Sequence, residues 1–214
     1  MTEEGTLQIE QRYWLCGKNL IAGVDEVGRG PLAGPVLACA VIFKKYFFLP
    51  GVRDSKKLSP HQRVRFAAEI KREALCWSVG LAGIHEIEQY NIRQATFMAM
   101  RRALDSLSIT PDFVLVDGEN LPEIPYESAG IIGGDNTSFT IAAASIVAKV
   151  ERDHIMEELD RYYPVYQFAR NKGYGTREHI QILRRYGPSL QHRRSFLKKI
   201  ITPALSGVTS VKPI

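Results

Sequence analysis

Three short apolar runs in this chain each end on acidic residues. The runs are four or five residues long, which is too short for a helix and suits a buried strand. Asp25 with Glu26 follows the first run, Asp117 follows the second, and Asp135 follows the third. Longer patterns with helical periodicity separate the runs. This alternation predicts a three-layer α/β domain in which the strand ends carry carboxylates.

Further strands and helices are predicted along the chain. Ser59 and Pro60 are typical of a helix N-cap and first turn, and Gly187 with Pro188 is typical of a helix end. A turn rich in glycine and proline joins the first two strands. We expect strands at residues 20–25, 36–43, 76–82, 113–116 and 131–132, and helices at residues 56–75, 84–107, 138–162 and 176–186.

The composition is that of a soluble globular protein. Of the 214 residues, 45% are hydrophobic and 24% are charged. The longest apolar stretch, residues 31–43, contains two prolines and is too short to span a bilayer. The first residues show no secretory signal. Cys16, Cys39 and Cys76 are odd in number and widely spaced, so we expect buried thiols rather than disulfides or zinc ligands. These features predict a cytoplasmic protein that does not contact a membrane.

The net charge of +5 is unevenly distributed. From residue 161 to the end, 11 Lys and Arg residues accompany a single acid, Glu178, while residues 1–160 hold 17 Lys and Arg against 22 Asp and Glu. A basic stretch alone is usually a solvated surface. Together with acidic strand ends, it favours a polyanionic partner such as a nucleic acid.

We expect one catalytic domain with a C-terminal addition. Residues 1–160 would form the catalytic core, and residues 161–201 a basic helical region that packs on this core. Residues 202–214 are rich in Pro, Ser, Thr and Gly and are expected to form a flexible tail.

The four carboxylates have the ligand chemistry of a site for hard divalent cations. Close like charges raise the pKa values of carboxyl groups unless a cation neutralises them. A ligand set made only of oxygens favours Mg²⁺ or Mn²⁺ over zinc. Two such ions, about 3.5–4 Å apart, would activate a water and stabilise a leaving oxygen.

The order of these acids leaves an alternative open. Asp25 and Glu26 are consecutive and would face opposite ways on a regular strand, so we expect the strand to end or bend there. The alternative is that the acids are solvated turn residues, as Asp117 before Gly118 also suggests.

A Gly-Arg-Gly sequence follows the first pair of acids. Glycines let a backbone approach a ligand with no Cβ in the way, so Gly28, Arg29 and Gly30 offer bare amides and a cation to a phosphodiester. A P-loop is not expected here, because the sequence lacks Gly-Lys-Ser/Thr and continues into prolines and a strand.

Several blocks of this sequence, in the same order, resemble the ribonuclease HII family. They include Asp-Glu-Val-Gly-Arg-Gly-Pro-Leu-Ala-Gly at 25–34, Asp-Ser-Lys-Lys-Leu-Ser at 54–59 and Lys-Gly-Tyr-Gly-Thr at 172–176. The resemblance spans roughly residues 20–197. It implies a ribonuclease H-like three-layer fold, with a mixed central sheet flanked by helices and a small helical C-terminal region. The remaining blocks lie at residues 116–118, 134–135, 138–153 and 192–196.

The resemblance also implies an activity. Members of the family are metal-dependent endoribonucleases that hydrolyse the RNA strand of RNA–DNA hybrids and cut on the 5′ side of single ribonucleotides embedded in duplex DNA. The products carry 3′-hydroxyl and 5′-phosphate ends. The implied partners are these two kinds of duplex, and the chain is expected to act as a monomer. The implied ligands of two Mg²⁺ or Mn²⁺ ions are Asp25, Glu26, Asp117 and Asp135.

Roles in substrate binding follow from the same resemblance. Backbone groups of Gly28, Arg29 and Gly30 would contact the ribose 2′-hydroxyl. Tyr174 would stack on the deoxyribose next to the ribonucleotide, although its residue type is equally suited to packing. Ser138 opens the longest predicted helix, whose free amides favour an anion. The candidate phosphate contacts, each otherwise an ordinary surface or capping residue, are Lys56, Lys57, Asn91, Ser138, Lys149, Arg193 and Arg194.

Two positions depart from the family's usual pattern. Gly134 stands where the family commonly has Lys before the fourth carboxylate, and Asn171 stands where it commonly has His before Lys-Gly-Tyr. Both departures bear on local phosphate contacts and rate rather than on the metal site. The related ribonuclease HIII carries a long N-terminal extension, whereas 24 residues precede Asp25 here, which favours the HII type.

Two other functions are open on the sequence alone. A different ribonuclease H-like nuclease or a recombinase would share the carboxylates. Tyr174, and Arg29 with its two flanking glycines, instead favour an enzyme that recognises RNA. A non-catalytic binder would use the basic C-terminal third. Clustered carboxylates suit a polyanion poorly unless a metal is bound, which argues against this second alternative.

Overall fold

Five strands form the central sheet: β1 (Ile21–Val27), β2 (Val36–Ile42), β3 (Cys76–Ala82), β4 (Phe113–Asp117) and β5 (Ser128–Ile131). Their order in the sheet is β3-β2-β1-β4-β5. β1 and β2 are antiparallel, whereas β4 is parallel to both β1 and β5, so the sheet is mixed. The structure is a computed structural model that describes residues 7–52, 58–198 and 200.

The predicted strands are confirmed, with differences at their ends. β3 has the predicted bounds, and the first strand extends past Asp25 to Val27. The strand predicted at residues 131–132 instead covers residues 128–131, and Ile132 is 94% exposed. β2 is buried along its whole length, as its unbroken apolar sequence requires.

The four predicted helices are also present. Ser59 forms a capping box with Gln62 at the start of α2, with Pro60 in the first turn. Gly187, at a positive φ of 72°, ends α6. Three short helices (α1, α5 and α7) were not predicted, because four to eight residues carry little periodicity. The helices are α1 (Gln8–Leu15), α2 (Pro60–Glu73), α3 (Ile84–Asp105), α4 (Phe139–Tyr162), α5 (Phe168–Asn171), α6 (Arg177–Tyr186) and α7 (Arg194–Leu197), with 3₁₀ helices η3 (Gly134–Asn136) and η4 (Pro164–Tyr166).

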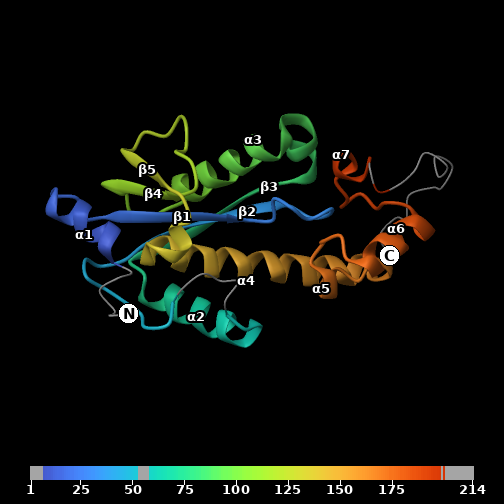
Figure 1. Cartoon of the computed structure of the whole chain (residues 1–214), viewed down its shortest axis with the longest axis horizontal. Helices are drawn as coiled ribbons and strands as arrows, with labels where there is room; N and C mark the ends of the chain where they lie inside the picture. The colour runs from blue at the N-terminus through green and yellow to red at the C-terminus, as the bar shows by residue number, and fades with distance from the viewer. Residues whose placement is uncertain (1–6, 53–57, 199, 201–214) are drawn as a thin grey trace. The chain divides into compact units, whose positions relative to one another are not determined.

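Helices lie on both faces of the sheet, which gives the predicted three layers (Figure 1). α4 begins against β1, where a Cβ on Gly23 would overlap the backbone of Thr140. α3 packs against β3, where a Cβ on Gly80 would overlap the carbonyl oxygen of Ala99. Glycine at these two strand positions therefore lets the helices approach the sheet closely, and α4 in particular lies beside the strand that carries Asp25.

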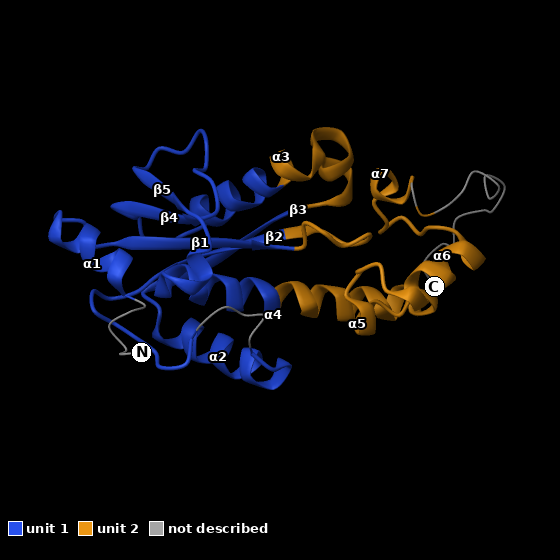
Figure 2. Ribbon diagram, in the orientation of Figure 1, with its two compact units in different colours: residues 1–27, 37–81, 96–150 blue, residues 28–36, 82–95, 151–214 orange. Residues whose placement is uncertain are grey.

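Backbone contacts group the chain into two compact units (Figure 2). The first unit contains the sheet and residues 96–150. The second unit consists of residues 28–36, 82–95 and 151 onward, and it has its own apolar core around Tyr166, Phe168 and Leu183. This grouping reflects only which residues lie close together within each unit. The predicted domain boundary at residue 160 and the packing of residues 161–201 on the core therefore stay predictions. Residues 202–214 lie outside the described residues.

The cysteines carry no disulfide among the described residues. Cys39 and Cys76 are buried free thiols, as expected. Cys16 is also free but exposed, because it follows the end of α1 at the surface, so the expectation of a buried thiol was wrong there. In the part of the chain that the structure describes, no helix has the length and apolarity that crossing a bilayer requires.

Candidate active site

In the first unit, three carboxylates from two adjacent strands lie together. Asp25 and Glu26 are on β1, and Asp117 is the last residue of β4. Because Val24 pairs with Val116 in the parallel ladder, the residues that follow them, Asp25 and Asp117, lie side by side. One ligand oxygen from each of the three carboxylates falls within 4.8 Å of the others.

Glu26 joins this cluster although the strand does not end at Asp25. β1 continues to Val27, where it still pairs with Leu37 of β2, so the strand does not end at the acids, and a bend stays a prediction. The paired residues of β1 and β4 end at Val24, so Asp25 and Glu26 lie beyond the β1–β4 ladder. The Glu26 amide donates to Asp25 Oδ1 at 2.7 Å, and this hydrogen bond fixes the orientation of the Asp25 carboxylate.

The fourth predicted carboxylate, Asp135, lies in η3 and is buried. Among the described residues it is not part of the group within 4.8 Å, and its Oδ1 accepts a hydrogen bond from the Asn136 side chain at 2.8 Å. Its neighbour Gly134 donates its amide to Asp117 Oδ1 at 2.7 Å. The structure therefore ties η3 to the cluster through the residue before Asp135, and Asp135 as a ligand stays a prediction.

The electrostatics of the cluster favour a cation. Burial raises the pKa of Asp25 well above its ordinary value, and the charges of Glu26 and Asp117 raise it further. Hydrogen bonds from Ser145 and from the Glu26 amide act in the opposite direction but are smaller effects. Buried oxygens that repel one another in this way are the donor set of a hard divalent cation, so the residues present fit such an ion.

The start of α4 is occupied from within the protein. Ser138 is buried, and its hydroxyl donates to Oε1 of Glu10 at 2.6 Å. The same Glu10 oxygen accepts the Thr140 amide at 2.9 Å and the Thr140 hydroxyl at 3.0 Å. Glu10 thus takes the place at these free amides that the sequence predicted for a phosphate. Ser138 would have to change partners in order to donate to a substrate.

The other predicted phosphate contacts have different surroundings. Asn91 sits at a kink in α3 with φ 66°, and its Oδ1 accepts the amides of Arg93 and Gln94, so it caps the second part of that helix. Lys149 is half-buried on α4, and Arg194 is exposed at the start of α7. Lys56 and Lys57 lie outside the described residues.

In the second unit, Arg193 holds the loop that contains Gly-Arg-Gly. Arg193 is fully buried, and its guanidinium group makes five hydrogen bonds, all to backbone carbonyls. Nη2 donates to Gly28 at 2.6 Å and to Gly34 at 2.8 Å, and Nη1 donates to Arg29 at 3.0 Å and to Pro31 at 2.9 Å. Nε also donates to Gly34. All five N–H donors are used, so in this arrangement none is left for the predicted phosphate contact.

A second buried guanidinium group, that of Arg152, joins this loop to the one that carries Tyr174. Arg152 donates to the carbonyls of Ala33 and Pro35 in the first loop and to that of Lys172 in the second, at 3.0–3.1 Å. Gly28 lies against it at φ 94°, where a Cβ would overlap Arg152 Nε. The glycine at residue 28 is therefore required by packing as well as by its backbone conformation.

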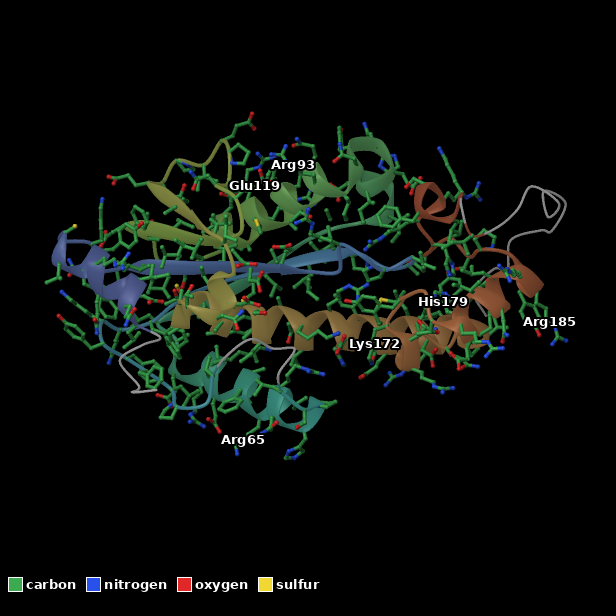
Figure 3. The ribbon with its side chains drawn as sticks, viewed as in Figure 1. Arg65, Arg93, Glu119, Lys172, His179 and Arg185 are labelled. Atoms are coloured by element: carbon green, nitrogen blue, oxygen red, sulfur yellow. The ribbon has the colours of Figure 1, made fainter. Side chains whose placement is uncertain are left out.

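The loop around Tyr174 is held at almost every backbone group. Asn171 accepts the Gly173 amide at 2.8 Å and donates to the Tyr166 carbonyl at 2.7 Å. Lys172 (Figure 3) forms an ion pair of 2.6 Å with Glu157. The Tyr174 ring remains 41% exposed on this fixed backbone.

The two loops are also joined directly, because the Leu32 amide donates to the Gly173 carbonyl at 2.7 Å. At the free end of the first loop, Arg29 and Gly30 are exposed, and a Cβ on Gly30 would meet no atom within 4 Å. The second unit thus presents a bare glycine backbone and an exposed aromatic ring from loops that share their supports.

Sequence reasoning missed the residues that support these groups. Ser145 and Arg152 lie in the matching block 138–153 but were given no role, and Glu10 and His179 lie outside the matching blocks. Glu10, Ser145 and Arg152 meet partners far away in the sequence, and His179 contacts Tyr174 five residues earlier. Arg193 was selected as a phosphate contact because of its charge. A buried arginine near a glycine-rich loop indicates hydrogen bonds to backbone carbonyls, but one sequence does not show that the side chain is buried.

Comparison with known proteins agrees with this geometry. The family model for ribonuclease HII matches residues 22–199. A ribonuclease HII from Desulfitobacterium hafniense is 53% identical over 193 residues, which cover 90% of this chain and 74% of the relative. A ribonuclease HII from Caldicellulosiruptor bescii is 48% identical over 200 residues, with 94% and 97% covered. The crystal structure of ribonuclease H2 from Pyrococcus horikoshii has a TM-score of 0.70 at 25% identity, with 85% and 96% covered.

The mixed sheet, the acidic cluster and these likenesses define a ribonuclease H-like hydrolase that depends on a divalent metal. More narrowly, the chain belongs to the ribonuclease HII family. It is therefore a ribonuclease H, an endonuclease that acts on RNA–DNA substrates.

The raised pKa of Asp25 predicts how the metal-free protein responds to pH. Because the folded protein binds this proton more tightly than the unfolded chain, wild-type stability should fall as pH rises from the ordinary pKa of 3.8 through the raised value. Asp25→Asn removes this titration, so in chelator it should be as stable as wild type or more stable at neutral pH, while metal-dependent turnover is nearly abolished. Urea denaturation at several pH values measures the effect.

The exposed acid Asp105, at the end of α3, provides the matched control. Asp105→Asn should leave both turnover and the pH dependence of stability unchanged. A variant Asp25→Asn that unfolds more easily than wild type at neutral pH would contradict the electrostatic account.

The five hydrogen bonds of Arg193 predict that lysine cannot replace it. Lysine has three donors on one nitrogen and would leave several buried carbonyls without a partner. Arg193→Lys should therefore lower the free energy of unfolding by about 2 kcal/mol or more, and kcat/KM should fall with it. Arg194→Lys, at the exposed neighbouring residue, should change stability by less than about 0.5 kcal/mol. If Arg193 were mainly a phosphate contact, its lysine variant would be as stable as wild type.

Proposed function

We propose that this ribonuclease H cuts both the RNA strand of RNA–DNA hybrids and single ribonucleotides embedded in duplex DNA. Cleavage falls on the 5′ side of the ribonucleotide and leaves 3′-hydroxyl and 5′-phosphate ends. The observation that carries the proposal is the pair of joined loops in the second unit. One loop exposes the backbone of Gly30, and the other exposes the ring of Tyr174.

The first loop is suited to reading one ribose. A backbone group that hydrogen-bonds a hydroxyl leaves a buried polar group unpaired when the hydroxyl is missing, and such sites can discriminate by about 10⁴–10⁵. The 2′-hydroxyl is what separates RNA from DNA at a given position. Gly30 has open space where a Cβ would stand, so a sugar can approach the backbone there. Arg193 and Arg152 keep this loop in one conformation before substrate binds.

The second loop is suited to testing the next sugar. An aromatic ring stacks well on a deoxyribose that has no hydroxyl at the 2′ position. Because the Leu32 amide and the Arg152 guanidinium group tie the two loops together, the ring of Tyr174 keeps its place relative to the Gly-Arg-Gly backbone. This arrangement supports recognition of the RNA-to-DNA junction as well as of the ribose itself.

For the chemical step, we propose that Asp25, Glu26, Asp117 and Asp135 hold two ions, either Mg²⁺ or Mn²⁺. When bound, such ions activate the attacking water and stabilise the leaving oxygen. Burial and the acidic neighbours raise the pKa of Asp25, so a bound cation would favour its charged form. Ser145 and the Glu26 amide then orient its carboxylate. In the sequence, Gly28 follows Glu26 by only two residues, so the loop that would contact the ribose comes directly after the first two proposed metal ligands.

We also propose that the basic region from residue 161 onward holds the duplex by its phosphates. Arg161 is exposed but already paired with Glu158. The other exposed cations among the described residues of this region are Arg170, Arg177, Arg184, Arg185, Arg194 and Lys198.

We further expect the protein to act as a monomer in the cytoplasm.

One assay tests the proposal. Three duplexes of equal length are compared: one with a single ribonucleotide, one with an all-RNA strand, and one of DNA only. Each is tested with Mg²⁺, with Mn²⁺ and with a chelator, and the products are mapped by their ends. We expect cleavage of the first two duplexes with metal, on the 5′ side of the ribonucleotide, and no cleavage of DNA. Cleavage of the DNA duplex would favour a DNA nuclease, and cleavage of the hybrid alone would remove the single-ribonucleotide activity.

Substitution of Tyr174 separates junction sensing from ribose reading. If the ring stacks on the following deoxyribose, Tyr174→Ala should lose about 1–3 kcal/mol of transition-state binding, by analogy with the stacking of bases on aromatic rings. This corresponds to roughly 5- to 150-fold in kcat/KM. The loss should be greater on the single-ribonucleotide duplex than on the hybrid, where the following sugar carries its own 2′-hydroxyl. Tyr174→Phe should keep most of the activity.

Gly30→Ala is the companion variant. A Cβ at residue 30 has free space in the protein, so stability should not change, but the new methyl group would stand in the way of the ribose. We expect equal losses on both duplexes. Equal losses for Tyr174→Ala on the two duplexes would remove the junction-sensing role and leave this ring as a packing residue.

A further inference from the structure

Two buried histidines lie behind the loop that carries Tyr174. His179 is on α6 (Figure 3), and His192 precedes Arg193, the residue that holds the Gly-Arg-Gly loop. Both imidazoles are almost completely buried in the second unit. Their Nε2 atoms are 3.0 Å apart, so the two rings share one hydrogen bond.

The partners of the outer nitrogens fix the direction of this hydrogen bond. His192 Nδ1 lies 3.0 Å from the Ser189 backbone amide and 2.8 Å from the Ser189 hydroxyl. Because the amide can only donate, Nδ1 is an acceptor and the proton of His192 is on Nε2. His192 Nε2–H therefore donates to His179 Nε2. His179 must then carry its proton on Nδ1, which donates to the Tyr174 carbonyl at 2.8 Å. The result is a one-way chain of hydrogen bonds that starts at Ser189 and ends at Tyr174.

The surroundings keep both rings neutral. The rings of Tyr166 and Phe168 pack against the pair at centroid distances of 4.8–5.8 Å. Tyr166 is the titratable group among them, and its hydroxyl donates to the Gly187 carbonyl. Burial raises the pKa of Tyr166 to about 12, so it stays uncharged. Among the described residues, the only charge that shifts the pKa of either imidazole is the partner imidazole, which acts on His192.

We propose that His179 and His192 are positioning residues for Tyr174, whose carbonyl they hold so that its exposed ring meets the sugar after the ribonucleotide. This inference rests on the proposed junction-sensing function. The Tyr174 carbonyl also accepts the Thr176 amide at 2.8 Å, and Thr176 in turn caps α6 by accepting the His179 amide. The histidine pair therefore adds a side-chain support to this carbonyl.

Protonation of His179 would place hydrogens on both facing Nε2 atoms, and protonation of His192 would place one on Nδ1, against the Ser189 amide. Burial lowers the pKa of His179, and burial together with His179 lowers that of His192 to about 3. Because the folded pKa values lie below the unfolded value, the contribution of the pair to stability is complete above the unfolded pKa of about 6.5 and is lost as pH falls towards the folded values. The chain of hydrogen bonds should therefore be intact at neutral pH, where the ring of His179 is fixed on both sides.

The first test compares two replacements of His179 by a selectivity ratio. The ratio is kcat/KM on the single-ribonucleotide duplex divided by kcat/KM on the all-RNA hybrid, at the same pH and metal concentration. His179→Leu removes the donor to Tyr174 and should lower the ratio by about 2- to 12-fold, the usual range for one net hydrogen bond. His179→Asn keeps an N–H close to the position of Nδ1 and should retain most of the ratio. His154→Leu, at an exposed histidine on α4, should leave the ratio unchanged.

Thermal denaturation of each variant separates folding from positioning. A purely structural role predicts that His179→Leu and His179→Asn both lower Tm while neither changes the ratio, and this result would overturn the proposal. A loss of ratio in His179→Leu that is largely restored in His179→Asn supports it.

The decisive measurement is a double-mutant cycle with Tyr174→Ala. If His179 acts through Tyr174, then His179→Leu should change the ratio by less than about 2-fold once the ring is absent. Effects that multiply independently would overturn the proposal. If Tyr174→Ala alone leaves the ratio unchanged, the junction-sensing function itself fails. The two failures are therefore distinguishable.

Discussion

Two buried guanidinium groups organise the loop that follows β1. A charge in a protein interior is costly unless hydrogen bonds replace the water it has lost. Arg193 and Arg152 meet this condition with eight hydrogen bonds to backbone carbonyls, seven of them within residues 28–35. The carbonyls gain partners that a loop without secondary structure would otherwise lack. Removal of either side chain would leave several buried acceptors unpaired, so the loop is held in one conformation before any substrate arrives.

The two units solve opposite electrostatic problems. In the second unit, the buried guanidinium groups of Arg193 and Arg152 are hydrogen-bonded to carbonyls, and Lys172 is paired with Glu157, so these groups have partners without a ligand. In the first unit, Asp25, Glu26 and Asp117 repel one another, and burial raises the pKa of Asp25. Such a cluster costs stability until a cation binds, which is the usual relation between a catalytic centre and its scaffold. Under the proposed function, the fixed loops would specify the substrate, while the clustered carboxylates favour binding of a metal.

The sequence predicted the strands and long helices well, because their apolar periods and capping residues are local signals. It also predicted that Asp25 and Asp117 would be neighbours, since both follow buried strands. It also predicted Glu26 in the cluster, but not that β1 would continue past it to Val27. The hydrogen bond between Ser138 and Glu10, 128 residues away, was not predicted either. The contacts of Arg193 with the loop cross 159–165 residues. Burial and long-range pairing decide these positions, and neither is written in a local pattern.

The two departures from the family pattern have structural compensations. At residue 171, the Asn side chain itself fixes the turn before Tyr174, because it accepts the Gly173 amide and donates to the Tyr166 carbonyl. At residue 134, the backbone amide donates to Asp117, and a Cβ would lie 3.2 Å from that carboxylate oxygen and 2.5 Å from Ile141 Cδ1. A side chain there would require Ile141 to move. Glycine therefore leaves room for Ile141 and keeps the backbone amide on Asp117.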